Sequence, residues 1–153
     1  MIKNAKQYVY ITTPYLIIDD EMESELTLAA QRGVDVRIVT PGIPDKKMVF
    51  LLTQANYENL IRGGVRIYQY TPGFIHAKCL VVDDEYASVG TTNLDFRALY
   101  LHFECGTLFY GSQLITRLKA DCLDVFGQSR EIQKNESGRR GLFREIGNAV
   151  LRV

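Results

Sequence analysis

This sequence of 153 residues lacks several features that mark common classes of protein. No apolar run approaches the roughly 20 residues of a membrane-spanning helix, and the N-terminal MIKNAKQY has no apolar core of a secretion signal. The sequence also contains no internal repeat and no low-complexity tract. With 46% hydrophobic and 24% charged residues, it has the composition of one soluble globular domain with a real core.

Cysteine is scarce, and its three positions (Cys79, Cys105 and Cys122) show no CxxC or Cys/His spacing. An odd number of cysteines without a metal-binding pattern favours free thiols in a reducing compartment. We therefore expect neither a disulfide framework nor a zinc site.

Net charge is also absent, because 18 basic residues balance 18 acidic ones. The segment from Arg130 to the end carries six basic and three acidic residues, so the preceding part of the chain has a net charge of −3. A dedicated nucleic-acid binder usually has a basic excess across its binding face. Nucleic acid is therefore not an expected partner.

The first half of the sequence alternates between the patterns of strands and helices. Strands are predicted at 8–13, 34–40 and 65–70 from runs of β-branched and apolar residues. One helix is predicted from a cap at Asp19 or Asp20 to Gly33, and a second from near Asp45 to the glycine pair at 63–64. This order is typical of βαβ crossovers and a parallel sheet.

The second half changes to consecutive strands, predicted at 76–82, 86–90 and 99–110, followed by a helix over about 112–133. The fold class is therefore predicted as α/β, with a mixed, largely parallel β-sheet flanked by helices on both faces. Residues 1–133 are expected to form this domain.

Residues 134–153 are predicted to be a basic C-terminal tail. The sequence RRGLFREIGNAVLRV places apolar residues on one side of a helix and arginines within reach of anionic headgroups. Two alternatives stay open: an amphipathic helix on an anionic membrane surface, or a short helix packed on the domain.

Candidate functional residues gather in IHAKCLVVDDEYASVGTTNLDF, residues 75–96. On a strand, His76 and Lys78 would project from the same face. Asp83 would close that strand, and a loop with Thr91, Thr92 and Asn93 would return beside its start. An ammonium, hydroxyls and an amide around an imidazole are the groups that bind a phosphate and attack its phosphorus. A pair of surface residues on a strand is the alternative.

A nucleophilic imidazole needs its second nitrogen held, usually by a carboxylate. Glu104 is the candidate because it would lie on the predicted strand 99–110, facing away from the apolar residues there. A solvated strand residue is the alternative. Asp83 would face away from His76 and is expected to brace the turn, and His102 is expected to be structural rather than a partner acid.

His76, Lys78 and Asp83 form the pattern HxKxxxxD, followed at family spacing by Gly90 and Asn93. This resembles the HKD signature of the phospholipase D superfamily. TPGFIHAK, VVDDEYASVGTTNLDFR and LHFE are most similar to the C-terminal half of bacterial cardiolipin synthases, over nearly all of the chain to about residue 127. The resemblance implies that the catalytic residues are His76, Lys78, Asp83, Asn93 and Glu104. It implies that the substrate-binding residues are Thr91, Thr92 and Tyr15.

The resemblance also implies phosphatidyl transfer through a phosphohistidine, with phosphatidylglycerol as donor and acceptor, at the cytoplasmic side of the cell membrane. It implies no metal and no other cofactor. Such enzymes use two HKD motifs, and this chain carries one. A second half is therefore an expected partner, either the N-terminal half of a longer enzyme or a homodimer mate. Two alternatives are a homodimeric phosphodiesterase or nuclease of the same superfamily, and an isolated half without activity.

Overall fold

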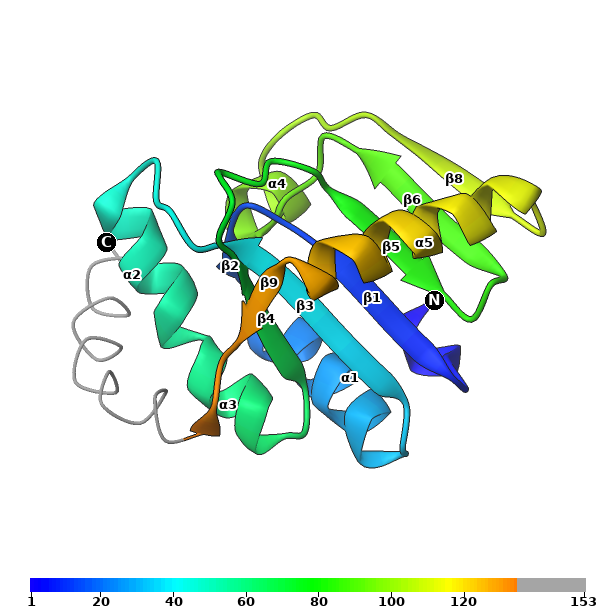
Figure 1. The fold of residues 1–153 in the computed structure, drawn as a ribbon, viewed down its shortest axis with the longest axis horizontal. Helices are drawn as coiled ribbons and strands as arrows, with labels where there is room; N and C mark the ends of the chain where they lie inside the picture. Colours follow the sequence, from blue (N-terminus) through cyan, green and yellow to red (C-terminus); the bar gives the residue numbers. More distant parts are fainter. Residues whose placement is uncertain (135–153) are drawn as a thin grey trace.

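A seven-stranded mixed sheet forms the centre of the computed structural model, which describes residues 1–134 (Figure 1). In spatial order the strands are β8 (Gly106–Tyr110), β6 (Tyr86–Gly90), β5 (Cys79–Val82), β1 (Tyr8–Thr12), β3 (Asp35–Pro41), β4 (Arg66–Tyr70) and β9 (Ser129–Glu131). The pairs β1–β3 and β3–β4 are parallel, and the other neighbours are antiparallel. The α/β class and the mixed sheet are confirmed, with parallel pairing confined to the three strands β1, β3 and β4.

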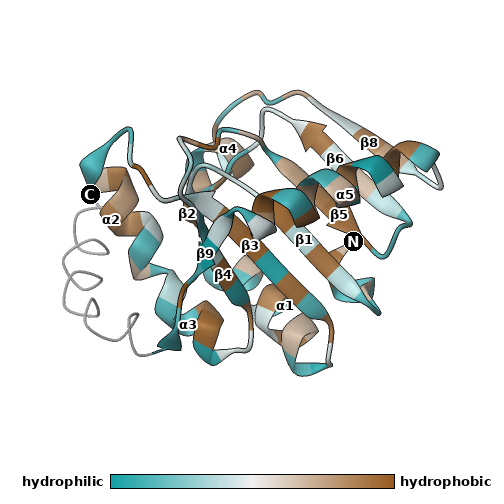
Figure 2. Cartoon of the chain, in the orientation of Figure 1, coloured by the Kyte–Doolittle hydropathy of each residue, from teal (hydrophilic) through white to brown (hydrophobic). Residues whose placement is uncertain are grey.

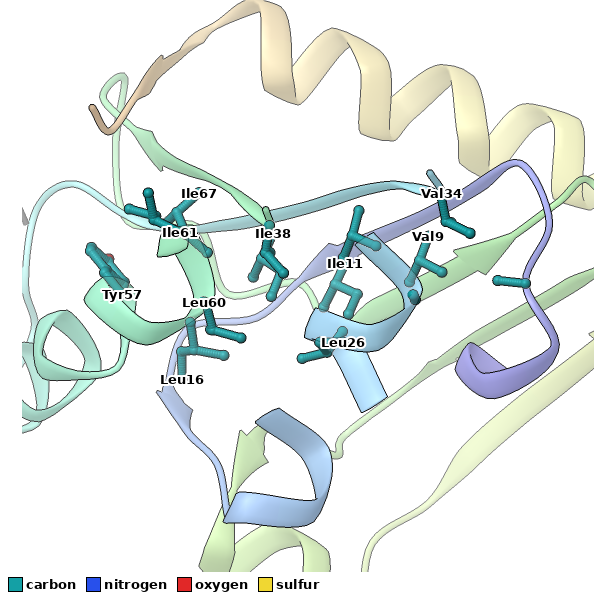
Figure 3. Packing of buried hydrophobic residues seen from close by; sticks show 14 of the residues in the cluster. Val9, Ile11, Leu16, Leu26, Val34, Ile38, Tyr57, Leu60, Ile61 and Ile67 are labelled. Atoms are coloured by element: carbon teal, nitrogen blue, oxygen red, sulfur yellow. The ribbon is translucent and has the colours of Figure 1, made fainter. Parts of the chain in front are cut away.

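Helices cover both faces of the sheet, as predicted (Figure 1). On one face, α1 (Asp20–Gln31) and α3 (Tyr57–Arg62) pack on the central strands, and Figure 3 shows their side chains meeting those of the sheet. On the other face lies α5 (Gln113–Gly127), where brown and teal segments alternate in Figure 2 as in an amphipathic helix. Ile115, Cys122 and Phe126 are its buried residues. The sheet therefore has a separate core on each side.

Local hydrogen bonds decide where the helices begin and end. Asp19 caps α1 by accepting a hydrogen bond from Met22 N at 2.8 Å, as one of the two predicted caps would. The single helix predicted from Asp45 to the glycine pair is wrong. It is divided into α2 (Lys47–Ala55) and α3 at Asn56, whose side-chain amide donates to the carbonyl of Leu52 at 2.9 Å.

The strand predicted over 99–110 is also wrong in its first half. Asp95 accepts a hydrogen bond from Ala98 N at 2.7 Å and so starts a short helix, α4 (Phe96–Tyr100). The strand that follows begins only at Gly106, so Glu104 lies in a loop. Just before α4, β7 (Leu94–Asp95) pairs with β2 (Leu16–Ile17) in a second, two-stranded sheet that the sequence did not predict.

The ends of the described chain complete the fold. A short 3-10 helix, η1 (Ile2–Asn4), precedes β1, and β9 follows α5 at a place where the sequence predicted more helix. Within residues 1–134, no helix is long and apolar enough to cross a membrane. The predicted amphipathic tail lies outside the described residues.

Candidate active site

His76 and Lys78 are in contact, although they do not lie on the predicted strand. The strand begins at Cys79, and residues 75–78 approach it as irregular chain. Lys78 Nζ lies 3.1 Å from both Nδ1 and Nε2 of His76 and 2.8 Å from the His76 carbonyl oxygen. The imidazole is exposed, with the ring of Phe74 centred 5.6 Å away. A base and a cation therefore share one accessible site.

Lys78 is half-buried, and its surroundings shift the pKa of its ammonium group. Desolvation lowers the pKa of Lys78, while the nearby carboxylates of Glu104 and Asp95 raise it and so favour the charged form. A partly dehydrated cation with few competing waters binds an anionic oxygen more strongly than a fully solvated one does.

Glu104 is held at this site by the loop after β6. The hydroxyl of Thr91 donates to the carboxylate of Glu104, and Cys105 N donates to the same hydroxyl at 2.9 Å. Thr91 N donates to the carbonyl of Cys105, also at 2.9 Å. Gly90 permits this close approach, since a Cβ there would lie 2.6 Å from the Cα of Gly106. Three local hydrogen bonds, rather than strand alternation, therefore orient Glu104.

Thr92 and Lys78 line a small cavity of about 70 Å³ beside the start of β5. The hydroxyl of Thr12 lines it too and, within residues 1–134, is buried without a hydrogen-bond partner. The side-chain oxygen of Asn93 is likewise buried and has no partner in the described part of the chain. Sequence reasoning did not identify Thr12, because a threonine within an apolar strand carries no functional signal.

Asp83 lies at the other end of β5 from His76. Its carboxylate accepts hydrogen bonds from Lys6 N, Gln7 N and Tyr8 N at 2.6, 2.9 and 2.8 Å. Four residues of strand, about 13 Å of chain, separate it from Lys78. The structure therefore places Asp83 as a brace at the start of β1, apart from the imidazole.

Tyr15 faces a second, larger cavity of about 830 Å³, which Asp95 and Arg97 also line. Its hydroxyl donates to Asp45 Oδ2 at 2.6 Å. Burial and this carboxylate raise the pKa of Tyr15 to about 12, so the phenol stays protonated at neutral pH. Within residues 1–134, Tyr15 has hydrogen bonds with Thr13 and Asp45 and none with His76.

His102 is closer to the site than the sequence suggested. Its Nε2 lies 3.2 Å from Arg97 Nη2, and its Nδ1 lies 3.8 Å from Glu104 Oε1. Because a guanidinium only donates, this contact assigns the acceptor role to Nε2 and leaves the proton on Nδ1, directed toward Glu104. His102 has no HxK pattern around it, so the sequence did not predict these contacts.

The described residues thus bring His76 into contact with Lys78, and Thr91 into contact with Glu104, whose carboxylate acts electrostatically on Lys78. Within residues 1–134, no hydrogen bond joins Glu104 to His76, and Asp83 lies at the far end of β5. Among residues 1–134, no group of three or more His, Cys, Asp or Glu side chains could hold a metal ion. The arrangement offers an accessible imidazole, a cation for an anion beside it, and an oriented carboxylate. These are the groups for covalent catalysis on a phosphate ester.

The chain is similar in sequence to known proteins over its whole length. Residues 1–123 match the family model described as "Cardiolipin synthase, PLD-like domain". The whole chain is 39% identical to cardiolipin synthase 2 of Bacillus cereus, of which it covers 30%, and 50% identical to an uncharacterized protein of Streptococcus mutans, of which it covers 33%. The chain therefore spans about a third of the length of these curated relatives.

Solved structures share the fold. The phospholipase D family member Nuc from Salmonella typhimurium is similar with a TM-score of 0.75 and 20% identity, over 86% of both chains. The phosphatidylserine synthase of Haemophilus influenzae has a TM-score of 0.70 and 19% identity, over 84% of this chain and 34% of that one. The seven-stranded sheet with its helices is thus an architecture already seen in these proteins.

Proposed function

This chain belongs to the cardiolipin synthase, phospholipase D-like domain family, and we propose that it forms one half of a phosphatidyltransferase of the cardiolipin synthase type. Its substrate is phosphatidylglycerol, and its reaction passes through a phosphohistidine. The observation that carries this proposal is the contact of the Lys78 ammonium, at 3.1 Å, with both ring nitrogens of His76.

In the first step, a ring nitrogen of His76 attacks the phosphorus of one phosphatidylglycerol. The P–N bond forms as the P–O bond to the terminal glycerol breaks, and the departing glycerol oxygen takes a proton from the histidine of a second HKD half. In the second step, a hydroxyl of another phosphatidylglycerol loses its proton to that histidine and attacks the phosphorus, and the new P–O bond forms as the P–N bond to His76 breaks and frees the imidazole. The products are cardiolipin and glycerol.

The neighbouring residues have supporting roles in this proposal. Lys78 neutralises the phosphate oxygens, with Thr91, Thr92 and Asn93 as further polar contacts of the substrate. Glu104 stabilises the positive charge that develops on the imidazole, for which its fixed position beside Thr91 is favourable. Asp83 supports the site indirectly, by holding the start of β1 next to β5.

A second HKD half is required, and the edge of the sheet at β8 offers a surface for it. Leu108 and Tyr110 on β8 are 62% and 68% exposed, and Phe103, in the loop before β8 and next to Glu104, is 109% exposed. Exposed apolar side chains at a sheet edge are typical of an interface. The partner is either another part of a longer enzyme or a second copy of this chain.

An anionic membrane surface is the second proposed partner, because the substrate resides in a bilayer. The start of α2 supports this. Lys46 and Lys47 are exposed there beside Ile43, Met48 and Leu51, which are 52%, 67% and 40% exposed. Apolar side chains next to cations are the pattern of a surface that binds anionic lipid. The chain would then act at the cytoplasmic side of the cell membrane.

The test is to incubate the purified chain in chelator with phosphatidylglycerol labelled on phosphorus, alone and together with an N-terminal half from a relative. Acid-labile label on the protein, and labelled cardiolipin when both halves are present, are expected. His76→Ala must lose the protein-bound label. His102→Ala, which removes the other histidine of the sequence, must retain it.

Two results would refute the proposal. Label that persists in His76→Ala would show that another residue is the nucleophile. Cleavage of DNA in the same buffer, without transfer from phosphatidylglycerol, would make the protein a nuclease of the same superfamily.

A further inference from the structure

The cavity of about 830 Å³ has no part in the chemistry proposed above. It lies among β2, α1, α2 and α4, and its apolar lining includes Ile17, Val49, Leu52, Phe96 and Leu101. Its size is in the range of small-molecule sites, which are roughly 300–1,000 Å³ and mostly apolar. The cavity is therefore large enough for a ligand.

This cavity adjoins the candidate active site. Asp95 lines it and also acts electrostatically on the ammonium of Lys78. Arg97 lines it as well and contacts His102, the neighbour of Glu104, at 3.2 Å. A ligand bound through its phosphate at Lys78 therefore has the cavity within reach of its other end.

The charges in the cavity decide which part of such a ligand enters. Two cations and four carboxylates line it, so a phosphate would meet net repulsion. Three of the carboxylates are already hydrogen-bonded: Asp19 to Met22 N, Glu23 to Asn59 Nδ2 and Asp95 to Ala98 N. The cavity is therefore suited to an uncharged, apolar group.

We propose that this cavity receives one acyl chain of the phospholipid whose phosphate lies at His76 and Lys78. The inference rests on the proposed function and extends it by naming where the apolar part of the substrate binds. Lys46, the residue just before α2, lines the cavity and lies near the exposed apolar residues Ile43 and Met48 in the sequence. An acyl chain that leaves a bilayer against α2 thus enters the cavity directly.

The experiment uses phosphatidylglycerol with a photoactivatable diazirine near the end of one acyl chain, presented in detergent micelles to the full chain. Cross-links are expected on α2 and α4, and they should be competed by unlabelled phosphatidylglycerol but not by its deacylated headgroup. Leu101→Gln should lower the labelling roughly fivefold or more, because it sets an amide against the alkyl chain. Leu101 is 67% exposed, so this variant keeps the fold.

Leu114→Gln is the matched control, because Leu114 is a 46% exposed leucine on α5 that does not line the cavity. Equal labelling of the two variants, or cross-links found mainly on α5 or β8, would overturn the inference. If phosphohistidine forms while the cross-links lie elsewhere, the acyl site is wrong and the proposed function stands. If the cavity is labelled but no phosphohistidine forms, the acyl site stands and the proposed function is wrong.

Discussion

The ammonium of Lys78 lies at equal distance, 3.1 Å, from the two ring nitrogens of His76. An anion that approaches either nitrogen therefore comes within hydrogen-bonding distance of a cation as well. The phosphorus of a phosphate ester placed there faces the imidazole while its oxygens face the ammonium. The positive charge of Lys78 is thus part of the site in which the imidazole of His76 meets a phosphate.

The first prediction concerns the protonation of Lys78. Because desolvation lowers its pKa from the ordinary 10.5, the ammonium loses its proton at a lower pH than a free lysine does. Phosphate binding should therefore weaken as the pH rises through this lowered pKa. The measurement is kcat/KM for phosphatidylglycerol between pH 7 and 11, for the chain paired with its second half.

Lys78→Arg tests the cause of this alkaline loss, because a guanidinium stays charged throughout that range. The variant should retain activity at high pH, even if its maximum is lower. An alkaline loss at the same pH in wild type and variant would assign the titration to another group.

The second prediction concerns the carboxylate of Glu104, which raises the pKa of Lys78 electrostatically. Glu104→Gln removes this charge but keeps an oxygen to accept the hydrogen bond of Thr91. The pKa of Lys78 should fall further, so the alkaline loss should move to lower pH. Glu85→Gln, an exposed change at the far turn of the β5–β6 hairpin, should leave the profile in place.

The third prediction concerns Asp83, which we expect to contribute stability rather than chemistry. Asp83→Ala leaves three backbone N–H groups without their carboxylate, which should lower the free energy of unfolding by about 2–4 kcal/mol in urea titrations. Asp84→Ala is the control, because Asp84 has nearly the same positive φ, 56° against 54°. It should cost about 1 kcal/mol through its exposed pair with Lys119 and its hydrogen bond with Tyr8.

Below its unfolding temperature, Asp83→Ala should still form the phosphohistidine. If the folded variant were unable to do so, Asp83 would belong to the reacting groups, as the HKD signature alone implies.

The fourth prediction compares two glycines that pair across β6 and β8. A methyl group at Gly90 would lie 2.6 Å from the Cα of Gly106, whereas the nearest atom to one at Gly106 would be 3.7 Å away. Gly90→Ala should therefore cost about 1–3 kcal/mol and displace the loop that holds Glu104, with a loss of phosphohistidine formation. Gly106→Ala should leave the free energy of unfolding and the formation of phosphohistidine unchanged. Equal effects of the two substitutions would contradict the close contact at Gly90.

The sequence predicted the parts of the fold that depend on local pattern. The strands at β1, β3, β4 and β6 and the cap of α1 follow from alternation and capping residues, and they are confirmed. The strand pattern from 99 to 105 failed at its start because Asp95, by accepting from Ala98 N, begins a helix that alternation of apolar residues does not reveal. That helix ends at Tyr100, and the chain continues without strand structure to Gly106.

The candidate site was predicted by residue type more accurately than by geometry. His76 and Lys78 are in contact as expected, but from irregular chain rather than from strand, so the expected alternation is not the reason. The position of Glu104 depends on Thr91 and on the pairing of Gly90 with Gly106, contacts between segments that a linear pattern does not contain. The connection of His102 to Arg97 also arises only in the folded chain.

The hydrogen bonds of Asp83 have a consequence for how the protein folds during its synthesis. Asp83 binds the start of β1 although it lies 75 residues after Tyr8 in the chain, and β1 lies between β3 and β5 in the finished sheet. During synthesis, β1 leaves the ribosome before the other strands of this sheet, but it is paired on both sides only after the hairpin of β5 and β6 has followed. Such distant pairing slows folding and leaves the edge of β1 toward β5 open in the meantime.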